Sequence, residues 1–110
     1  MSAPAALIAL STAPSGEEAA RLARALVEER IAACVSVVPG LRSIYRWQGR
    51  LVEDEEWLLI IKTSPQAWPR LAARLPELHP YEVPELVALP VSAGSPAYLA
   101  WLGEATDAGS

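Results

Sequence analysis

The chain contains few of the residues on which redox, metal and catalytic sites depend. Its 110 residues include one cysteine, one histidine, one methionine, and no phenylalanine or asparagine. A single cysteine forbids a disulfide within the chain, so the cytosol is the expected compartment. No run approaches the roughly 20 apolar residues of a membrane span, and the first residues lack the basic cluster of a secretory signal. We therefore expect a cytoplasmic protein with no membrane partner.

Basic charge is also scarce. Nine Lys and Arg residues against 13 Asp and Glu residues give a formal net charge of -4. Nucleic-acid binding needs a basic face, so we expect no nucleic-acid partner. Hydrophobic residues make up 52% of the chain and charged residues 20%, which is a globular composition. We expect residues 1–110 to form a single domain with its core at about residues 5–103.

The most informative stretch has the pattern of a long β-hairpin. Two segments rich in β-branched and aromatic residues, 31–47 and 50–63, flank the dipeptide Gln48-Gly49, which is a turn signal. A two-residue turn would place Arg42 opposite Glu55, whereas a longer loop would shift this register. Pro39-Gly40 predicts a bulge or bend in the first arm.

This hairpin also predicts a partner. Each arm exceeds a dozen residues, against about five or six for a usual strand, and the helices of so short a chain cannot cover it. The proline-rich edge strand at 84–91 offers a second free edge, and a ring of subunits would close both edges. The alternative is a twisted, solvent-exposed hairpin stabilised by its charges. In either register, the acidic residues 53–56 lie near Arg42, Arg46 and Arg50 and are partly neutralised by them.

The remaining elements complete a recognisable order. Ser15 caps a helix that runs to about Arg30, and a second helix begins either at Ser64-Pro65 or near Trp68. Strands are expected at 5–11, at 57–61 within the second arm of the hairpin, and at 86–91, and a short helix at 97–102. The sequence thus predicts an α+β protein with the ferredoxin-like order βαββαβ plus a C-terminal helix. Its sheet is antiparallel, with both crossover helices on one face.

Metal donors are few. Cys34 and His79 are soft or borderline donors, but a closed zinc site needs about four ligands. Symmetry in an oligomer would bring copies of these residues together or pair them with Glu82 and Glu85. The plainer interpretations are that Cys34 is a small buried hydrophobe and that His79 is a hydrogen-bonded loop residue.

Catalysis has little support. Cys34 and His79 could form a thiolate pair, but nothing in their spacing shows that they meet, and no asparagine is available as an orienting third group. The missing asparagine also excludes an acylphosphatase-type site, and no glycine-rich phosphate loop is present. We therefore predict no catalytic residue and no cofactor-binding residue.

Four motifs resemble the signature of the CutA divalent-cation-tolerance proteins. They are residues 32–49 (AACVSVVPGLRSIYRWQG), 56–63 (EWLLIIKT), 79–85 (HPYEVPE) and 98–102 (YLAWL). On these motifs, which span nearly the whole chain, the protein is identified as a member of that family. The resemblance implies a tight homotrimer of ferredoxin-like subunits, similar in architecture to the PII signalling proteins and generally cytoplasmic in bacteria.

The resemblance also implies a function. The family is named for tolerance to divalent metals, copper above all, and metal binding in it has been linked to Cys, His and Glu of these motifs. We expect a non-enzymatic homotrimer, joined through its edge strands and long hairpin, that binds Cu²⁺ first and Zn²⁺ next between subunits and needs no metal to fold. The expected ligands are Cys34, His79, Glu82 and Glu85.

A second function remains open. The chain could be a PII-like signalling or scaffold protein whose inter-subunit cleft holds a small anion or a partner peptide. Arg42, Arg46 or Lys62 would then supply the binding charge, and Cys34 would belong to the core.

Overall fold

The structure is a computed structural model that describes residues 4–109. It confirms the expected order of elements. They are β1 (Leu7–Ala13), α1 (Gly16–Glu28), β2 (Cys34–Trp47), β3 (Arg50–Thr63), α2 (Trp68–Leu78), β4 (Val87–Pro90) and α3 (Pro96–Ala105). The strands form one antiparallel sheet in the order β2-β3-β1-β4, which is the split βαβ arrangement that the sequence predicts.

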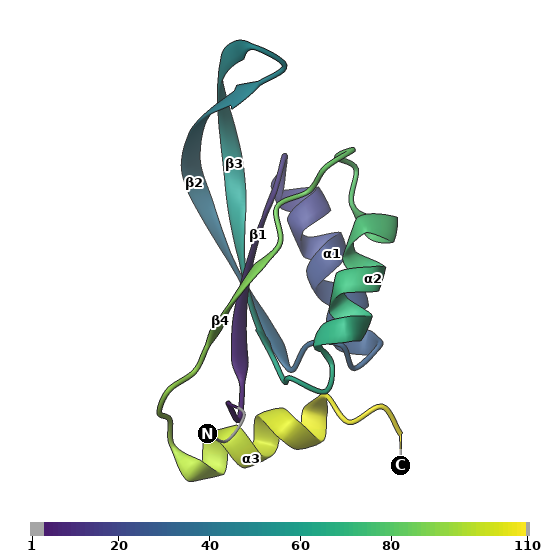
Figure 1. Ribbon diagram of the computed structural model, residues 1–110. Helices are drawn as coiled ribbons and strands as arrows, with labels where there is room; N and C mark the ends of the chain where they lie inside the picture. The colour runs from purple at the N-terminus through teal and green to yellow at the C-terminus, as the bar shows by residue number, and fades with distance from the viewer. Residues whose placement is uncertain (1–3, 110) are drawn as a thin grey trace.

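The helices cover one face of the sheet. α1 and α2 lie together against that face, and α3 lies across the end of the sheet opposite the hairpin tip (Figure 1). The core between sheet and helices is aliphatic, because alternate strand residues meet the apolar stripes of both helices. Its largest fully buried members are Leu22, Leu26, Leu59, Ile61, Leu71 and Leu75.

The helix starts follow local capping chemistry. Ser15 Oγ accepts a hydrogen bond from the Glu18 amide at 3.1 Å, as expected. α2 begins at Trp68 rather than at Ser64-Pro65. This choice places Pro69 in the first turn, where a missing N–H removes no helical hydrogen bond. Ser64 instead accepts from the amide of Ala67 at 3.2 Å, and so closes the turn that precedes the helix.

The hairpin has the register expected for a two-residue turn. Arg42 pairs with Glu55 and Trp47 with Arg50, and the register shifts between Val38 and Leu41. The predicted bulge at Pro39-Gly40 is therefore confirmed, and Gly40 adopts a φ of 83°. Because β1 ends at Ala13, opposite Trp57, the outer half of β3 has β2 as its only neighbour in the sheet. This outer half projects beyond the helices (Figure 1).

The acidic block lies near the hairpin arginines as expected, with Arg42 opposite Glu55, but in the described part of the chain no ion pair joins them. Within residues 4–109, the ion pairs are Arg21–Glu18, Arg74–Glu29 and Arg74–Glu77, so none joins a hairpin arginine to residues 53–56. Instead, tyrosine hydroxyl groups donate to two of these acids: Tyr45 to Asp54 at 2.5 Å and Tyr81 to Glu56 at 2.7 Å. A long arginine on a strand facing water gains little from such a pair.

The face of the sheet away from α1 and α2, which we term the open face, is also apolar. Its side chains alternate with those that enter the core, and the strand registers bring them together on one side. Its apolar members are Ile8 and Leu10 of β1, Val38 of β2, Leu58 and Ile60 of β3, and Val87 and Leu89 of β4, and the polar residues on the same side are Thr12, Ser36, Cys34, Glu56 and Lys62. Val87 and Leu89 are 51% and 55% exposed. An antiparallel sheet that faced water on this side would carry mainly polar residues there.

Two glycines test the bulge directly. A side chain at Gly40 or at Gly103 would meet nothing within 4 Å, but only Gly40 has a positive φ, of 83°. We expect Gly40→Ala to lower the free energy of unfolding by about 1–2 kcal/mol, because an L-residue is strained there. Gly103→Ala in α3 should raise it by up to about 1 kcal/mol. Urea unfolding at matched protein concentration measures both, and equal changes would contradict a strained bulge.

Candidate functional site

The loop that follows α2, residues 79–85, is fixed by buried hydrogen bonds. His79 is 7% exposed. Its Nε2 lies 2.7 Å from the Thr12 carbonyl oxygen, and its Nδ1 accepts from the Tyr81 amide at 3.1 Å. The ring is therefore the neutral tautomer with its proton on Nε2, and both nitrogens are occupied. At the other end of the loop, Ser11 Oγ donates to the Glu85 carbonyl at 2.7 Å.

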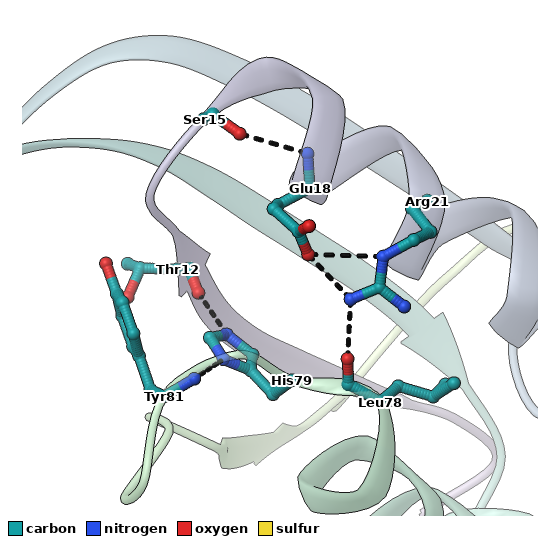
Figure 2. Close-up of polar contacts among 7 residues, drawn as sticks. All are labelled: Thr12, Ser15, Glu18, Arg21, Leu78, His79 and Tyr81. Carbon is teal, nitrogen blue, oxygen red and sulfur yellow. Dashed lines mark hydrogen bonds and ion pairs between the residues drawn. The ribbon is translucent and has the colours of Figure 1, made fainter.

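An arginine of α1 holds the start of this loop. Figure 2 shows Arg21 reaching from α1 to the end of α2. Its guanidinium donates to the Glu18 carboxylate and to the Leu78 carbonyl, both at 2.6 Å. The last carbonyl groups of a helix have no partner within the helix. Arg21 supplies one here, and so fixes the residue that precedes His79.

Two tyrosine–carboxylate pairs follow from this placement. Tyr81 crosses from the loop to Glu56 of β3, while Tyr45 of β2 reaches Asp54 on the neighbouring strand. Glu56 is only 6% exposed. Burial first, and then the hydrogen bond to Glu56, raise the pKa of Tyr81 above its usual range. Tyr45 and Tyr81 together line two adjoining hollows between the hairpin and the loop.

Cys34 lies elsewhere, near the other end of the sheet. It pairs with Lys62 on β3 and is half-buried on the open face. The Lys62 ammonium donates to Ser36 Oγ at 2.5 Å and lies 3.7 Å from Cys34 Sγ. A fixed positive charge at this distance opposes the approach of a metal cation to the thiol.

The four sequence-predicted ligands do not close around one ion within a single subunit. Thr12, which holds His79, pairs with Leu58, whereas Cys34 pairs with Lys62. Leu58 and Lys62 stand four residues apart on β3, so His79 and Cys34 contact the sheet at points about 13 Å apart. This separation is far longer than a metal–ligand bond. Glu82 and Glu85 are exposed on the loop. Among residues 4–109, no three His, Cys, Asp or Glu side chains form a group that could hold a metal ion.

Sequence reasoning missed the tyrosine–carboxylate pairs. Tyr81 and Glu56 stand 25 positions apart, and their hydrogen bond depends on the loop crossing the sheet. The Tyr45–Asp54 contact could have been found, because both residues lie on facing arms of the predicted hairpin. An acidic block opposite an aromatic strand was the available signal.

Comparison with known proteins agrees with the fold. The profile of the CutA1 divalent ion tolerance protein family matches residues 7–105. The chain is 59% identical over 99 residues to the divalent-cation tolerance protein CutA of Thermus thermophilus, covering 90% of this chain and 96% of that protein. It is 46% identical to protein CutA of Mus musculus, of which it spans 56%.

Solved structures agree as well. A divalent cation tolerance protein (Cut A1) from Thermus thermophilus superposes with a TM-score of 0.90 at 57% identity, covering 93% of this chain and 99% of the other. A protein from Archaeoglobus fulgidus, described as a periplasmic divalent cation tolerance protein CutA, gives a TM-score of 0.89 at 31% identity, with 93% and 99% coverage. The chain belongs to the CutA1 divalent ion tolerance family. Over residues 4–109, none of its helices has the length and hydropathy to cross a membrane.

Tyr81 yields a pH-dependent prediction. The folded state holds the Tyr81 proton more tightly than the unfolded chain, whose tyrosine pKa is about 10. Its contribution to stability is therefore fully present below pH 10 and is lost as the pH rises beyond it. Tyr81→Phe should lower the free energy of unfolding by about 1–3 kcal/mol at neutral pH. The difference from the unmodified protein should shrink above about pH 10.

Unfolding curves between pH 7 and pH 11 measure that difference. Tyr98→Phe is the matched control, because Tyr98 lies on α3 with 45% exposure. The free energy of unfolding of Tyr98→Phe should change with pH in the same way as that of the unmodified protein between pH 7 and pH 11. A constant gap between the protein and Tyr81→Phe at every pH would contradict the assigned role of the Glu56 hydrogen bond.

Proposed function

We propose that the chain is the subunit of a PII-like homotrimer. The observation that supports this assembly is the apolar open face, which would expose a contiguous aliphatic surface in a monomer. Over the described residues 4–109, both sheet edges are also unpaired, because β2 pairs with β3 alone and β4 with β1 alone. A closed ring that covers the open face and pairs the edges removes both liabilities.

The assembled protein binds divalent cations between subunits, Cu²⁺ ahead of Zn²⁺. Membership of a family of divalent ion tolerance proteins supports the class of ligand, and the order follows the general preference of N and S donors. Cys34, Glu82 and Glu85 are accessible donors in one subunit, and copies from neighbouring subunits complete the coordination. His79 joins them by exchanging its Thr12 hydrogen bond for the metal.

The role is binding rather than catalysis, in the cytoplasm. We assign no catalytic residue and no resident cofactor. The single free cysteine supports a reducing compartment.

Lys62 supports a second candidate function, that of a PII-like scaffold which holds a small anion or a partner peptide in its inter-subunit cleft. Its ammonium lies on a largely apolar face, held by Ser36. Once a neighbouring subunit covers that face, a buried cation needs an anionic partner. In this function Cys34 is a packing residue.

The assembly can be tested by light scattering. The protein should have roughly three times the chain mass of 11.8 kDa. Ile60→Asp places a charge in the middle of the open face and should give a monomer. Val27→Asp, on the exposed face of α1, is the matched control and should leave the mass unchanged. A monomer for the unmodified protein at micromolar concentration would overturn the trimer and every inter-subunit site.

Metal binding can be tested by calorimetric titration with Cu²⁺ and with Zn²⁺, which has no redox chemistry toward the thiol. Cys34→Ser should weaken saturable binding by about tenfold or more, and Glu17→Gln, on the exposed start of α1, should not. Lys62→Met removes the opposing charge 3.7 Å from the thiol and should strengthen binding. Weak binding unaffected by Cys34→Ser would overturn the metal function and favour the anion-binding scaffold.

A further inference from the structure

The last helix, α3, packs on a small apolar cluster that is separate from the main core. It buries Leu102, which clusters with Ala6 and Ala33, whereas α1 buries three residues and α2 two in the main core. Three partly buried residues pack against the small cluster, Val91, Leu99 and Ala105. The outer side of α3 carries Tyr98 and Trp101, each 45% exposed. Apolar burial therefore stabilises the position of α3 less than it stabilises α1 and α2.

The chain leaves α1 through a turn that is strained at Arg30. The Ile31 amide donates to the Leu26 carbonyl at 2.9 Å, and the Arg30 amide donates to the Val27 carbonyl at 3.1 Å. This is the Schellman pattern, in which the residue at the position of Arg30 is usually glycine. Arg30 has a φ of 60°, which strains any residue other than glycine. Such strain indicates that the side chain has a role that glycine could not fill.

The Arg30 side chain bonds to the end of α3. Its Nε donates to the Asp107 carbonyl at 3.0 Å, and its Nη2 donates to the Glu104 carbonyl at 2.9 Å. The last carbonyl groups of a helix lack partners within the helix, and together they carry a partial negative charge. The Arg30 guanidinium group therefore satisfies these carbonyl groups and balances their charge.

Arg70 of α2 bonds to the ends of both α1 and α3. Its Nη2 donates to the Thr106 carbonyl at 2.9 Å and to the Arg30 carbonyl at 3.3 Å. Its Nη1 donates to the Glu29 carbonyl at 3.5 Å. The ends of α1 and α3 thus lie beside each other, close to the start of α2 (Figure 1). Two helix ends of like charge repel each other, so the guanidinium groups between them stabilise the contact.

A pair of hydroxyl groups holds the same end of α3. Thr106 and Ser64 are 1% and 2% exposed, and their hydroxyl oxygens lie 2.8 Å apart. Most of what fixes α3 is therefore a set of hydrogen bonds gathered at one end of the helix. When such groups separate, water takes the place of each partner, so the net cost of opening is modest.

We propose that Arg30 and Arg70 hold α3 across the end of the sheet, and that α3 opens and closes as a unit while the main core stays folded. Four of their five hydrogen bonds to carbonyl oxygens are exposed to water, as expected of a contact that opens locally. Opening uncovers Ala6 and Ala33 at the end of the sheet. This motion requires neither a metal ion nor contact between subunits, and so it goes beyond the function proposed above.

Native-state hydrogen exchange of the full-length protein, followed for single amides by NMR, tests the opening. We expect the hydrogen-bonded amides of α3 to exchange about a hundredfold faster than the slowest amides of β1 and β3. Low concentrations of urea should leave the α3 rates unchanged, because local opening exposes little surface. Amides of α3 that exchange as slowly as those of β1 and β3 would overturn the proposal.

Two substitutions by glycine separate the Arg30 side chain from the strain of its backbone. Arg30→Gly removes the guanidinium group and relieves a positive φ, and it should speed exchange in α3 by about tenfold without speeding exchange in β1 and β3. Gln48→Gly relieves a φ of 50° in the hairpin turn, at the opposite end of the molecule (Figure 1), and should leave α3 unchanged. Equal α3 rates in these two variants would contradict the role of Arg30.

A second pair of variants tests Arg70. Arg70→Met keeps the apolar stem of the side chain and should speed exchange in α3 by about tenfold. Arg74→Met is the matched control one turn further along α2, because Arg74 pairs with Glu29 and Glu77. It should leave the α3 rates unchanged. If Arg70→Met speeds exchange in α3, β1 and β3 by the same factor, α3 does not open separately and the proposal fails.

Discussion

The antiparallel pairing of β2 with β3 is the constraint on which the rest of the structure depends. Along the inner half, Cys34 pairs with Lys62 and Val38 with Leu58. The bulge then adds one residue to β2, and the side of the sheet that each β2 residue faces reverses beyond it. Tyr45, rather than Ile44, consequently lies on the same side as Asp54. Without the extra residue at Pro39-Gly40, Tyr45 would point the other way.

The 79–85 loop is the second fixed part of the molecule. His79 and Ser11 hold it through buried or partly buried hydrogen bonds to carbonyl oxygens or amides, and Arg21 adds an exposed one to the Leu78 carbonyl. Leaving any of these groups unpaired would cost about 1–3 kcal/mol. The loop therefore holds Tyr81 against Glu56 without helix or strand structure of its own. Because both ring nitrogens of His79 are bonded, a metal ion would have to replace one of these partners.

Two regions of different chemistry result. The open face is aliphatic and carries one thiol, one ammonium and one hydroxyl group near its end, in Cys34, Lys62 and Ser36. The groove beyond the bulge, formed by the two hollows that Tyr45 and Tyr81 line, is aromatic and anionic. The first is suited to contact with another copy of the chain. They adjoin on one side of the sheet, because Glu56 of the groove and Leu58 of the open face alternate along β3.

The sequence by itself determined the order of strands and helices and the family, because each depends on local patterns, whereas it left open the hairpin register and the start of α2. Gln48-Gly49 set the turn, Pro39-Gly40 the bulge, and Ser15 a helix start. Only the tertiary structure decided which polar groups meet. His79 is a candidate ligand by sequence, and only the fold shows that its ring also bonds to Thr12, which is 67 positions away. By sequence, Glu56 is one of four consecutive acidic residues, and only the fold shows that the Tyr81 hydroxyl group donates to it. Side-chain partners far apart in the chain depend on how a loop crosses a sheet, and no local periodicity records that path.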